Sequence, residues 1–152
     1  MISNDILRRL RYTFDLNDDK MIAIFKLGGL ETSRETICNW LRKEEDEGFQ
    51  PIKDIEAAMF LNGFIIEKRG AKDSATPDPE EFLTNNQILR KLKIALDMKD
   101  SDILELMENE NSKISKHELS ALFRKKGHKH YRECKDQFLR NFLNGLQVKV
   151  RP

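Results

Sequence analysis

The chain has 152 residues, of which 39% are hydrophobic and 35% are charged. This composition suits small helical units with much solvated surface rather than one large enclosed core. No apolar run reaches the roughly 18 residues that a membrane-spanning helix needs, and the first residues lack the basic start and apolar stretch of a secretory signal. We therefore expect no membrane partner and a cytoplasmic location.

The net charge of +1 is unevenly distributed along the chain. Residues 1–83 carry 12 basic and 17 acidic residues, whereas residues 84–152 carry 15 basic and 9 acidic residues. Two interpretations follow. The two halves present solvated faces that attract each other within the molecule, or only the second half meets a polyanion.

An internal repeat organises the chain. Residues 4–66, shifted by 82 positions, align without a gap on residues 86–148, and 16 of the 63 aligned pairs are identical. The repeat predicts an all-α fold made of two tandem four-helix units that are related by internal duplication and an approximate two-fold. We expect repeats at residues 1–69 and 84–148, joined by a proline-containing linker at residues 70–83. Because each repeat is small, the two are expected to bury surface against each other.

Apolar residues at helical spacing mark the first helix of each repeat, around Ile6 and Ile88. Thr84 opens the one in the second repeat, because Gln87 stands three residues later as in a capping box. For the second helix of the first repeat, Asp18 or Asp19 is the expected cap.

Gly28 and Gly29 are expected to end that second helix, and Asn109 to Asn111 take this place in the second repeat. Gly63 and Gly145 occupy equivalent positions in otherwise helical runs, which indicates a C-cap or a close helix crossing.

Capping-box spacing also opens the third helices, with Thr32 before Glu35 and Ser115 before Glu118. Trp40 lies in the apolar stripe of this helix and is expected in the core, with Cys38 as a smaller core residue. The fourth helix is expected to begin near Pro51, since proline suits a first helical position.

Four segments, at residues 40–44, 60–64, 67–70 and 132–140, resemble the YehS-like family of uncharacterised bacterial proteins. The resemblance covers nearly the whole chain. It implies a small bacterial cytosolic protein with a duplicated domain of unassigned function, and it supplies no catalytic residues.

Residues 19–25 and 33–43 are similar to the second and third helices of a DNA-binding helix-turn-helix. Ser33, Arg34, Thr36 and Asn39 would be the base-reading side chains. Two features oppose this interpretation: the break at residues 28–33 is longer than the usual three or four residues, and four consecutive acids follow at residues 44–47.

The second repeat carries basic residues where the first carries these acids. If the protein binds nucleic acid, these basic residues are the candidate contacts: Lys116, Arg124, Lys125, Lys126, Lys129 and Arg132. The competing hypothesis is a protein–protein interaction adaptor with no nucleic-acid contact, which would use exposed apolar surface.

Three potential metal ligands, His128, His130 and Cys134, lie within seven residues of one another, with His117 upstream. Zinc sites need about four ligands at compatible spacing, so solvated histidines in a basic stretch are the simpler interpretation. The sequence has no phosphate-binding glycine loop, nucleophile elbow or zinc-protease helix. We therefore expect no catalytic residues, no cofactor and no bound metal.

Overall fold

The computed structural model describes residues 1–71 and 78–152, and all the regular structure in these ranges is helical. The chain divides into two compact units, Met1–Leu83 and Thr84–Pro152. The prediction of an all-α fold is confirmed. Residues 72–77 of the predicted linker lie outside the described residues, and the linker limits and the approximate two-fold stay predictions.

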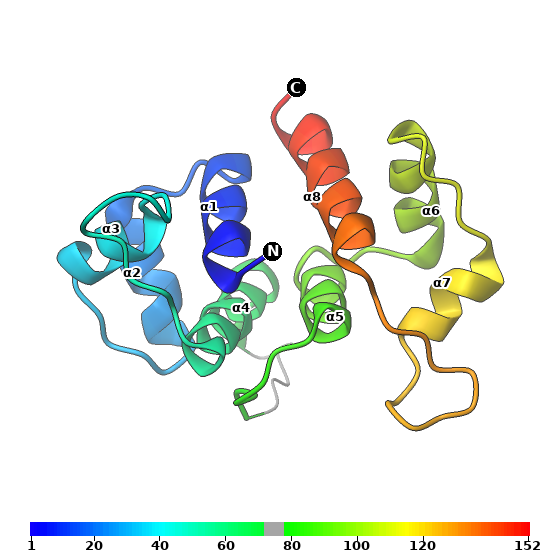
Figure 1. Ribbon diagram of the computed structural model, residues 1–152, viewed down its shortest axis with the longest axis horizontal. Coiled ribbons are helices and arrows are strands. Elements are labelled where there is room, and N and C mark those ends of the chain that lie inside the picture. Colours follow the sequence, from blue (N-terminus) through cyan, green and yellow to red (C-terminus); the bar gives the residue numbers. More distant parts are fainter. Residues whose placement is uncertain (72–77) are drawn as a thin grey trace. The chain divides into compact units, whose positions relative to one another are not determined.

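The helices of the two units follow the same order at the same offset (Figure 1). The first unit contains α1 (Ser3–Thr13), α2 (Asp18–Leu27), α3 (Arg34–Leu41) and α4 (Asp54–Arg69). The second contains α5 (Asn85–Ala95), α6 (Asp100–Asn109), α7 (Lys116–Leu122) and α8 (Asp136–Val150). Every helix of the second unit begins 82 residues after its counterpart. The internal duplication is thus a structural as well as a sequence repeat.

The predicted helix starts are correct in the second unit and displaced in the first. Thr84 and Ser115 cap α5 and α7 as predicted, each within a capping box. In the first unit, Asn17 rather than Asp18 or Asp19 caps α2, and Ser33 rather than Thr32 caps α3. Asn17 and Ser33 are themselves strong N-cap residues, so the caps lie within one position of the residues predicted.

The predicted start of α4 near Pro51 is wrong, because this helix begins at Asp54. Pro51 lies in an extended segment between Gln50 and Ile52, and both neighbours are bound through their backbones to the side chain of Asn4. The helix can begin only after this attachment.

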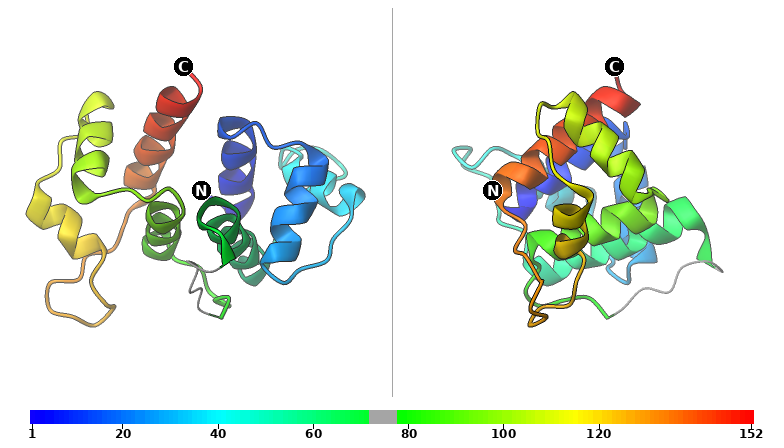
Figure 2. Two further views of the ribbon diagram at one scale, coloured as in Figure 1. Left: turned by 180° about the vertical axis from the view of Figure 1, so that it is seen from behind. Right: turned by 90° about the vertical axis from the view of Figure 1, so that its right-hand side faces the viewer.

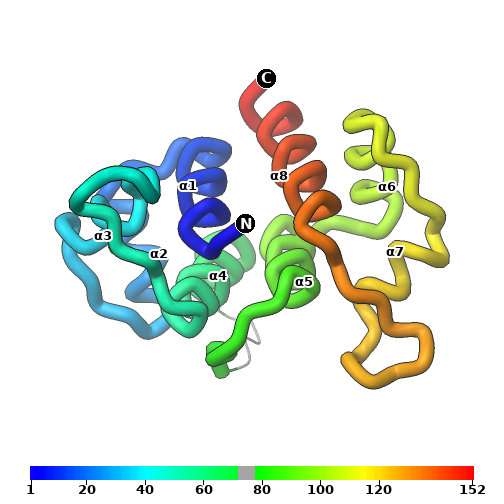
Figure 3. The backbone as a smooth tube through the Cα atoms, viewed as in Figure 1, coloured from blue at the N-terminus to red at the C-terminus, as the bar shows by residue number. Residues whose placement is uncertain are grey.

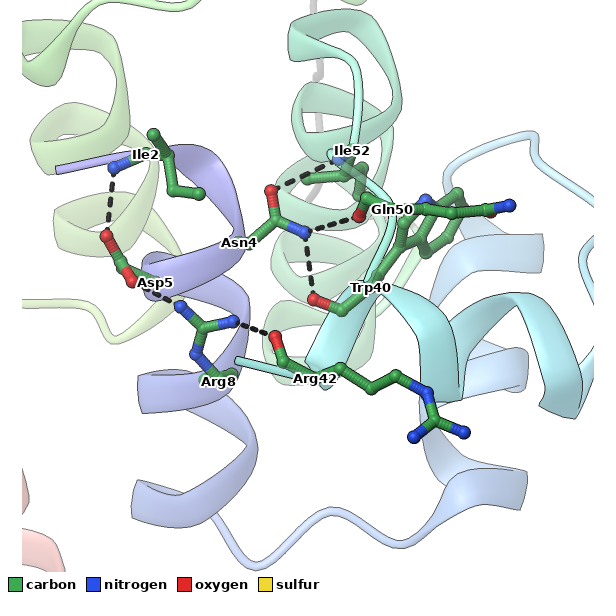
Figure 4. A network of polar contacts seen from close by, with 8 residues as sticks. All are labelled: Ile2, Asn4, Asp5, Arg8, Trp40, Arg42, Gln50 and Ile52. Carbon is green, nitrogen blue, oxygen red and sulfur yellow. Dashed lines mark hydrogen bonds and ion pairs between the residues drawn. The ribbon is translucent and has the colours of Figure 1, made fainter. Parts of the chain in front are cut away.

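Asn4 on α1 fixes the path of the chain between α3 and α4 (Figure 4). Its side-chain amide donates to the carbonyl oxygens of Trp40 at 2.8 Å and Gln50 at 2.9 Å. Its amide oxygen accepts from the backbone N–H of Ile52 at 3.1 Å. The bonds to the Trp40 carbonyl and the Ile52 N–H are buried, so these two groups would lack a partner without Asn4, whereas the bond to the Gln50 carbonyl is part-buried. One side chain therefore holds both ends of a long loop.

Asn86 repeats this arrangement in the second unit. Its amide donates to the carbonyl oxygens of Leu122 at 2.9 Å and Arg132 at 2.8 Å, and its oxygen accepts from the N–H of Cys134 at 2.8 Å. Each of these residues is 82 positions after its counterpart. The same hydrogen bonds thus hold the loop between α7 and α8.

Arg8 adds a second attachment in the first unit (Figure 4). Its guanidinium pairs with Asp5 one turn earlier and donates to the carbonyl oxygen of Arg42 at 2.6 Å. Arg42 is the residue at which α3 ends, so α1 supplies donors to the C-terminal end of α3.

Aromatic residues fill the core of the first unit. The ring of Phe25 lies 5.3 Å from Trp40 and 4.9 Å from Phe60, centroid to centroid. Trp40 is 4% exposed, which confirms its predicted place in the core. The prediction for Cys38 is wrong, because its side chain is exposed. Ile37 and Trp40 face the core three residues apart, and Cys38 falls outside that stripe.

Helices α2 and α4 cross at two glycines, as predicted for Gly63. A Cβ atom at Gly63 would lie 1.9 Å from the carbonyl oxygen of Ile24, and one at Gly28 would lie 1.8 Å from that of Met59. In the second unit, a Cβ atom at Gly145 would instead meet the side chain of Leu106 at 2.3 Å. The first crossing is therefore backbone against backbone, whereas the second is backbone against a side chain.

Replacing Asn4 with alanine should lower the free energy of unfolding by about 3 kcal/mol, because two carbonyls and one N–H lose their partner. Trp40 is the one tryptophan of the chain, so its fluorescence in urea reports on the first unit. Lys26→Ala, at an exposed position on α2 of the same unit, serves as the control and should change stability by less than about 0.5 kcal/mol. Equal effects of the two substitutions would show that the Asn4 hydrogen bonds do not hold the fold.

Gly63→Ala should destabilise the protein by about 3 kcal/mol, because the backbones of α2 and α4 must separate. Gly145→Ala should cost less than Gly63→Ala, because its methyl group meets the buried side chain of Leu106 rather than backbone atoms. Urea unfolding followed by far-UV circular dichroism measures both. A larger loss for Gly145→Ala would contradict the assigned crossing.

Candidate nucleic-acid interface

The loops after α3 and after α7 have equivalent backbone hydrogen bonds, but Gly127 in the second adopts a φ of +97°, a left-handed conformation that its counterpart Glu45 does not share. We call residues 42–50 the acidic loop and residues 124–132 the basic loop. In the acidic loop, the N–H of Asp46 donates to Lys43 O at 3.0 Å, and in the basic loop the N–H of His128 donates to Lys125 O at 3.0 Å. Each loop ends on a further bond to the third helix of its unit, at 3.1 Å in both cases. Figures 2 and 3 show the two loops in cyan and orange, after α3 and α7.

The side chains give the two loops opposite charge. The basic loop holds five lysine or arginine residues and no acid, whereas the acidic loop holds two basic and four acidic residues. Glu44 to Glu47 in the first unit stand where Lys126 to Lys129 stand in the second.

The six predicted contact residues are all exposed. We call them the basic surface: Lys116, Arg124, Lys125, Lys126, Lys129 and Arg132. Lys116 is the first residue of α7, and the other five belong to the basic loop. Their side chains are thus open to solvent, as a contact with phosphate would require.

Two contacts bring the start of α7 to the end of the basic loop. Arg132 pairs with Glu118 at 3.3 Å, and the rings of His117 and His130 lie 6.4 Å apart between centroids. The first turn of α7, which includes Lys116, therefore lies close to the end of the basic loop. Hydrogen bonds from Ser115, its backbone N–H first, lower the pKa of the Glu118 carboxyl, so this acid stays ionised and partly neutralises Arg132.

The candidate readers of the helix-turn-helix interpretation are engaged within the first unit. Ser33 caps α3 and accepts from the N–H of Thr36 at 3.1 Å, and Arg34 pairs with Asp19 at 2.8 Å. Asn39 accepts from Arg42 at 3.3 Å. These side chains would have to give up internal partners to read bases, so the geometry favours the second unit over this motif.

Cys134 is separated from the histidines that precede it. Its side chain is 2% exposed, whereas His128 and His130 are exposed. Burial, and to a lesser extent Asp136 and Glu133, raises the pKa of the Cys134 thiol to about 12. Such a thiol is neither a ready nucleophile nor a ready metal ligand. Among the described residues, no group of three His, Cys, Asp or Glu is placed to hold a metal ion.

The structure also contains a hollow that the sequence did not indicate. It has a volume of about 480 Å³, lies open to solvent, and is lined by residues 30–33, by Thr36 and Trp40 of α3 and by Glu56 of α4. Glu31 and Glu56 line it, and Glu56 accepts from the backbone N–H of Lys53 at 3.0 Å. Because the hollow is open and the Glu56 carboxylate already caps α4, we do not assign it a binding role.

Within residues 1–71 and 78–152, none of the helices combines the length and the apolar character that crossing a bilayer requires.

A family model described as "Protein of unknown function (DUF1456)" matches the chain twice, at residues 3–70 and 85–151. The chain belongs to the DUF1456 family. It is also similar to the "Uncharacterized protein YehS" of Escherichia coli (strain K12), with 46% identity over 150 residues, which cover 98% of this chain and 96% of that protein. No solved structure matches. The two matches of the DUF1456 model confirm the predicted duplication and the predicted family.

Near pH 8, thiol reagents should modify Cys38 rapidly and leave Cys134 intact, because Cys38 is exposed whereas Cys134 is buried with a raised pKa. A colorimetric disulfide reagent should count one thiol per native chain and two after denaturation. The Cys38→Ser variant is the control and should show no fast reaction until it unfolds. Fast reaction of this variant in its native state would contradict the burial of Cys134.

Proposed function

We propose that the protein is a non-enzymatic binding protein whose basic surface contacts nucleic acid. The observation that carries the proposal is the opposite charge of two loops that have equivalent backbone hydrogen bonds. Since the acidic and basic loops have the same backbone hydrogen bonds, the positive charge of the second is not a requirement of the fold.

The arrangement of the charges supports a polyanion as the partner. Four of the cations, Arg124 to Lys126 and Lys129, have exposed side chains, and no acidic residue lies within the basic loop. Clustered lysine and arginine on one face release counterions from a phosphate backbone, which is the main source of nonspecific affinity for nucleic acid. Arg132 contributes less, because Glu118 faces it.

A cytoplasmic location belongs to this proposal. Both cysteines are free thiols, and Cys38 is exposed, as in proteins of reducing compartments.

A protein partner is the competing class, and salt separates the two. Binding to phosphates weakens steeply as salt rises, whereas an interface with an apolar core depends on salt much less. Titrations at several salt concentrations therefore decide between the classes whatever base sequence the protein binds.

Reversing Lys125 and Lys126 to glutamate should weaken binding to every nucleic-acid sequence tested. Each phosphate contact adds about 0.9 to the magnitude of the log–log salt slope on duplex DNA, so the slope should fall by about 2. Fluorescence anisotropy at several salt concentrations measures both quantities.

Two variants of the acidic loop provide the controls. Arg42→Glu with Lys43→Glu changes the net charge by the same amount, and Lys43→Glu with Glu44→Lys leaves it unchanged. Both should bind nearly as the natural protein does, because the acidic loop makes no contact in this proposal. If the natural protein binds neither duplex DNA, single-stranded DNA nor RNA at low salt, the proposal fails and a protein partner takes its place.

A further inference from the structure

We infer that the basic surface takes single-stranded rather than duplex nucleic acid, with unpaired bases stacked on three histidine rings. This inference rests on the proposed function and adds the class of nucleic acid. It depends on three side chains that are not among the lysines and arginines of the basic surface, namely His117, His128 and His130.

The three rings form a cluster on the basic surface. His128 and His130 lie on the basic loop, and His117 follows Lys116 on α7. The centroids of His128 and His130 are 5.6 Å apart, and those of His117 and His130 are 6.4 Å apart. All three side chains are exposed. Rings from two elements thus stand side by side in solvent, where they bury little apolar surface and do not serve the core.

The loop holds one ring in place before any ligand arrives. The backbone N–H of His130 donates to Nδ1 of His128 at 3.0 Å. The carbonyl oxygen of His128 accepts from the N–H of Tyr131 at 2.9 Å. The first bond fixes the orientation of the His128 ring. A ring that is already ordered loses less entropy when a base stacks on it.

Only unpaired bases can use such rings. In a duplex, the faces of the bases are covered by their neighbours, and the protein reaches phosphates and groove edges. In a single strand, bases turn outward and stack on aromatic side chains, histidine included, while cations follow the backbone. Lys129 lies between His128 and His130 in sequence, and Lys116 adjoins His117, so rings and cations alternate as this mode requires.

The first unit offers an internal comparison. The residues equivalent to His117, His128 and His130 are Glu35, Asp46 and Gly48. The basic loop therefore carries both cations and histidine rings. The acidic loop carries mainly acids and no histidine. Cations and rings at the same place point to a ligand that combines phosphates with exposed bases.

The test uses the full chain and fluorescent strands of about 12 nucleotides, a length in the range that such surfaces cover. Four probes of equal length are compared: single-stranded DNA, single-stranded RNA, the duplex of the same sequence, and an abasic strand. The abasic strand keeps the sugar–phosphate backbone but has no bases. Near neutral pH and at low salt, the base-containing single strands should bind at least about tenfold more tightly than the duplex and the abasic strand. Equal affinity for all four probes would overturn the inference and leave the proposed function standing. Failure to bind any probe would remove the proposed function itself.

Substitutions at His130 separate stacking from charge. His130→Ala should weaken binding of base-containing single strands about tenfold and leave the abasic strand nearly unaffected. His130→Phe keeps a ring without a proton site and should restore binding, whereas His130→Lys keeps a charge without a ring and should not. The opposite order, with lysine effective and phenylalanine ineffective, would overturn the inference. Gly48→Ala, at the equivalent place in the first unit, is the matched control and should bind as the natural protein does.

Discussion

A single buried asparagine in each unit is the constraint on which the loops depend. Asn4 and Asn86 each satisfy three backbone groups: two carbonyls at 2.8–2.9 Å and one N–H at 2.8–3.1 Å. These groups belong to the end of the third helix and to the segment before the fourth. A backbone group that is buried without a partner is costly, so the loop must return to the asparagine whatever its own sequence is. The path of the loop is set from α1 and α5, not from within the loop.

Because the asparagines hold the ends of the loops, the exposed side chains of the two loops can differ widely. The turns use backbone hydrogen bonds at 3.0 Å for Asp46 and His128, and in the basic loop the His128 ring accepts a further bond from the N–H of His130. Most side chains between the attachment points are exposed, so they can change without disturbing the core. Glu44 to Glu47 and Lys126 to Lys129 are therefore alternative surfaces on one framework. A change of partner between the units needs no change in the fold, which is the usual relation between scaffold and binding loop.

The sequence predicted the architecture because the repeat and the apolar stripes are both local patterns. The order of the helices, the capping boxes of Thr84 and Ser115, and the burial of Trp40 followed from spacing alone. The start of α4 did not, because Pro51 looks like a first helical residue until the distant Asn4 is known to hold its neighbours. A signal for Asn4 was present nevertheless: it is identical to Asn86 and adjoins an apolar stripe in both repeats. The exposed place of Cys38 required the orientation of α3, which its short stripe fixes only approximately.

The candidate site was predicted as a list of charges, and its arrangement needed the structure. All six basic residues were found from composition, because a run of like charge is visible in the sequence. The nearness of His117 to His130 was not, since twelve residues and the end of a helix separate them in the chain.

The asparagine attachment also bears on how such a surface could act. Because Asn86 binds Leu122, Arg132 and Cys134 directly, the two ends of the basic loop are fixed to buried parts of the second unit. A loop that is fixed at its base presents its cations and rings with less freedom to lose on binding than a free linker would. The buried Cys134, with its raised pKa, belongs to this base rather than to the surface. The exposed residues 124–130 are thus followed directly by the backbone groups of Arg132 and Cys134 that hold the loop to the fold.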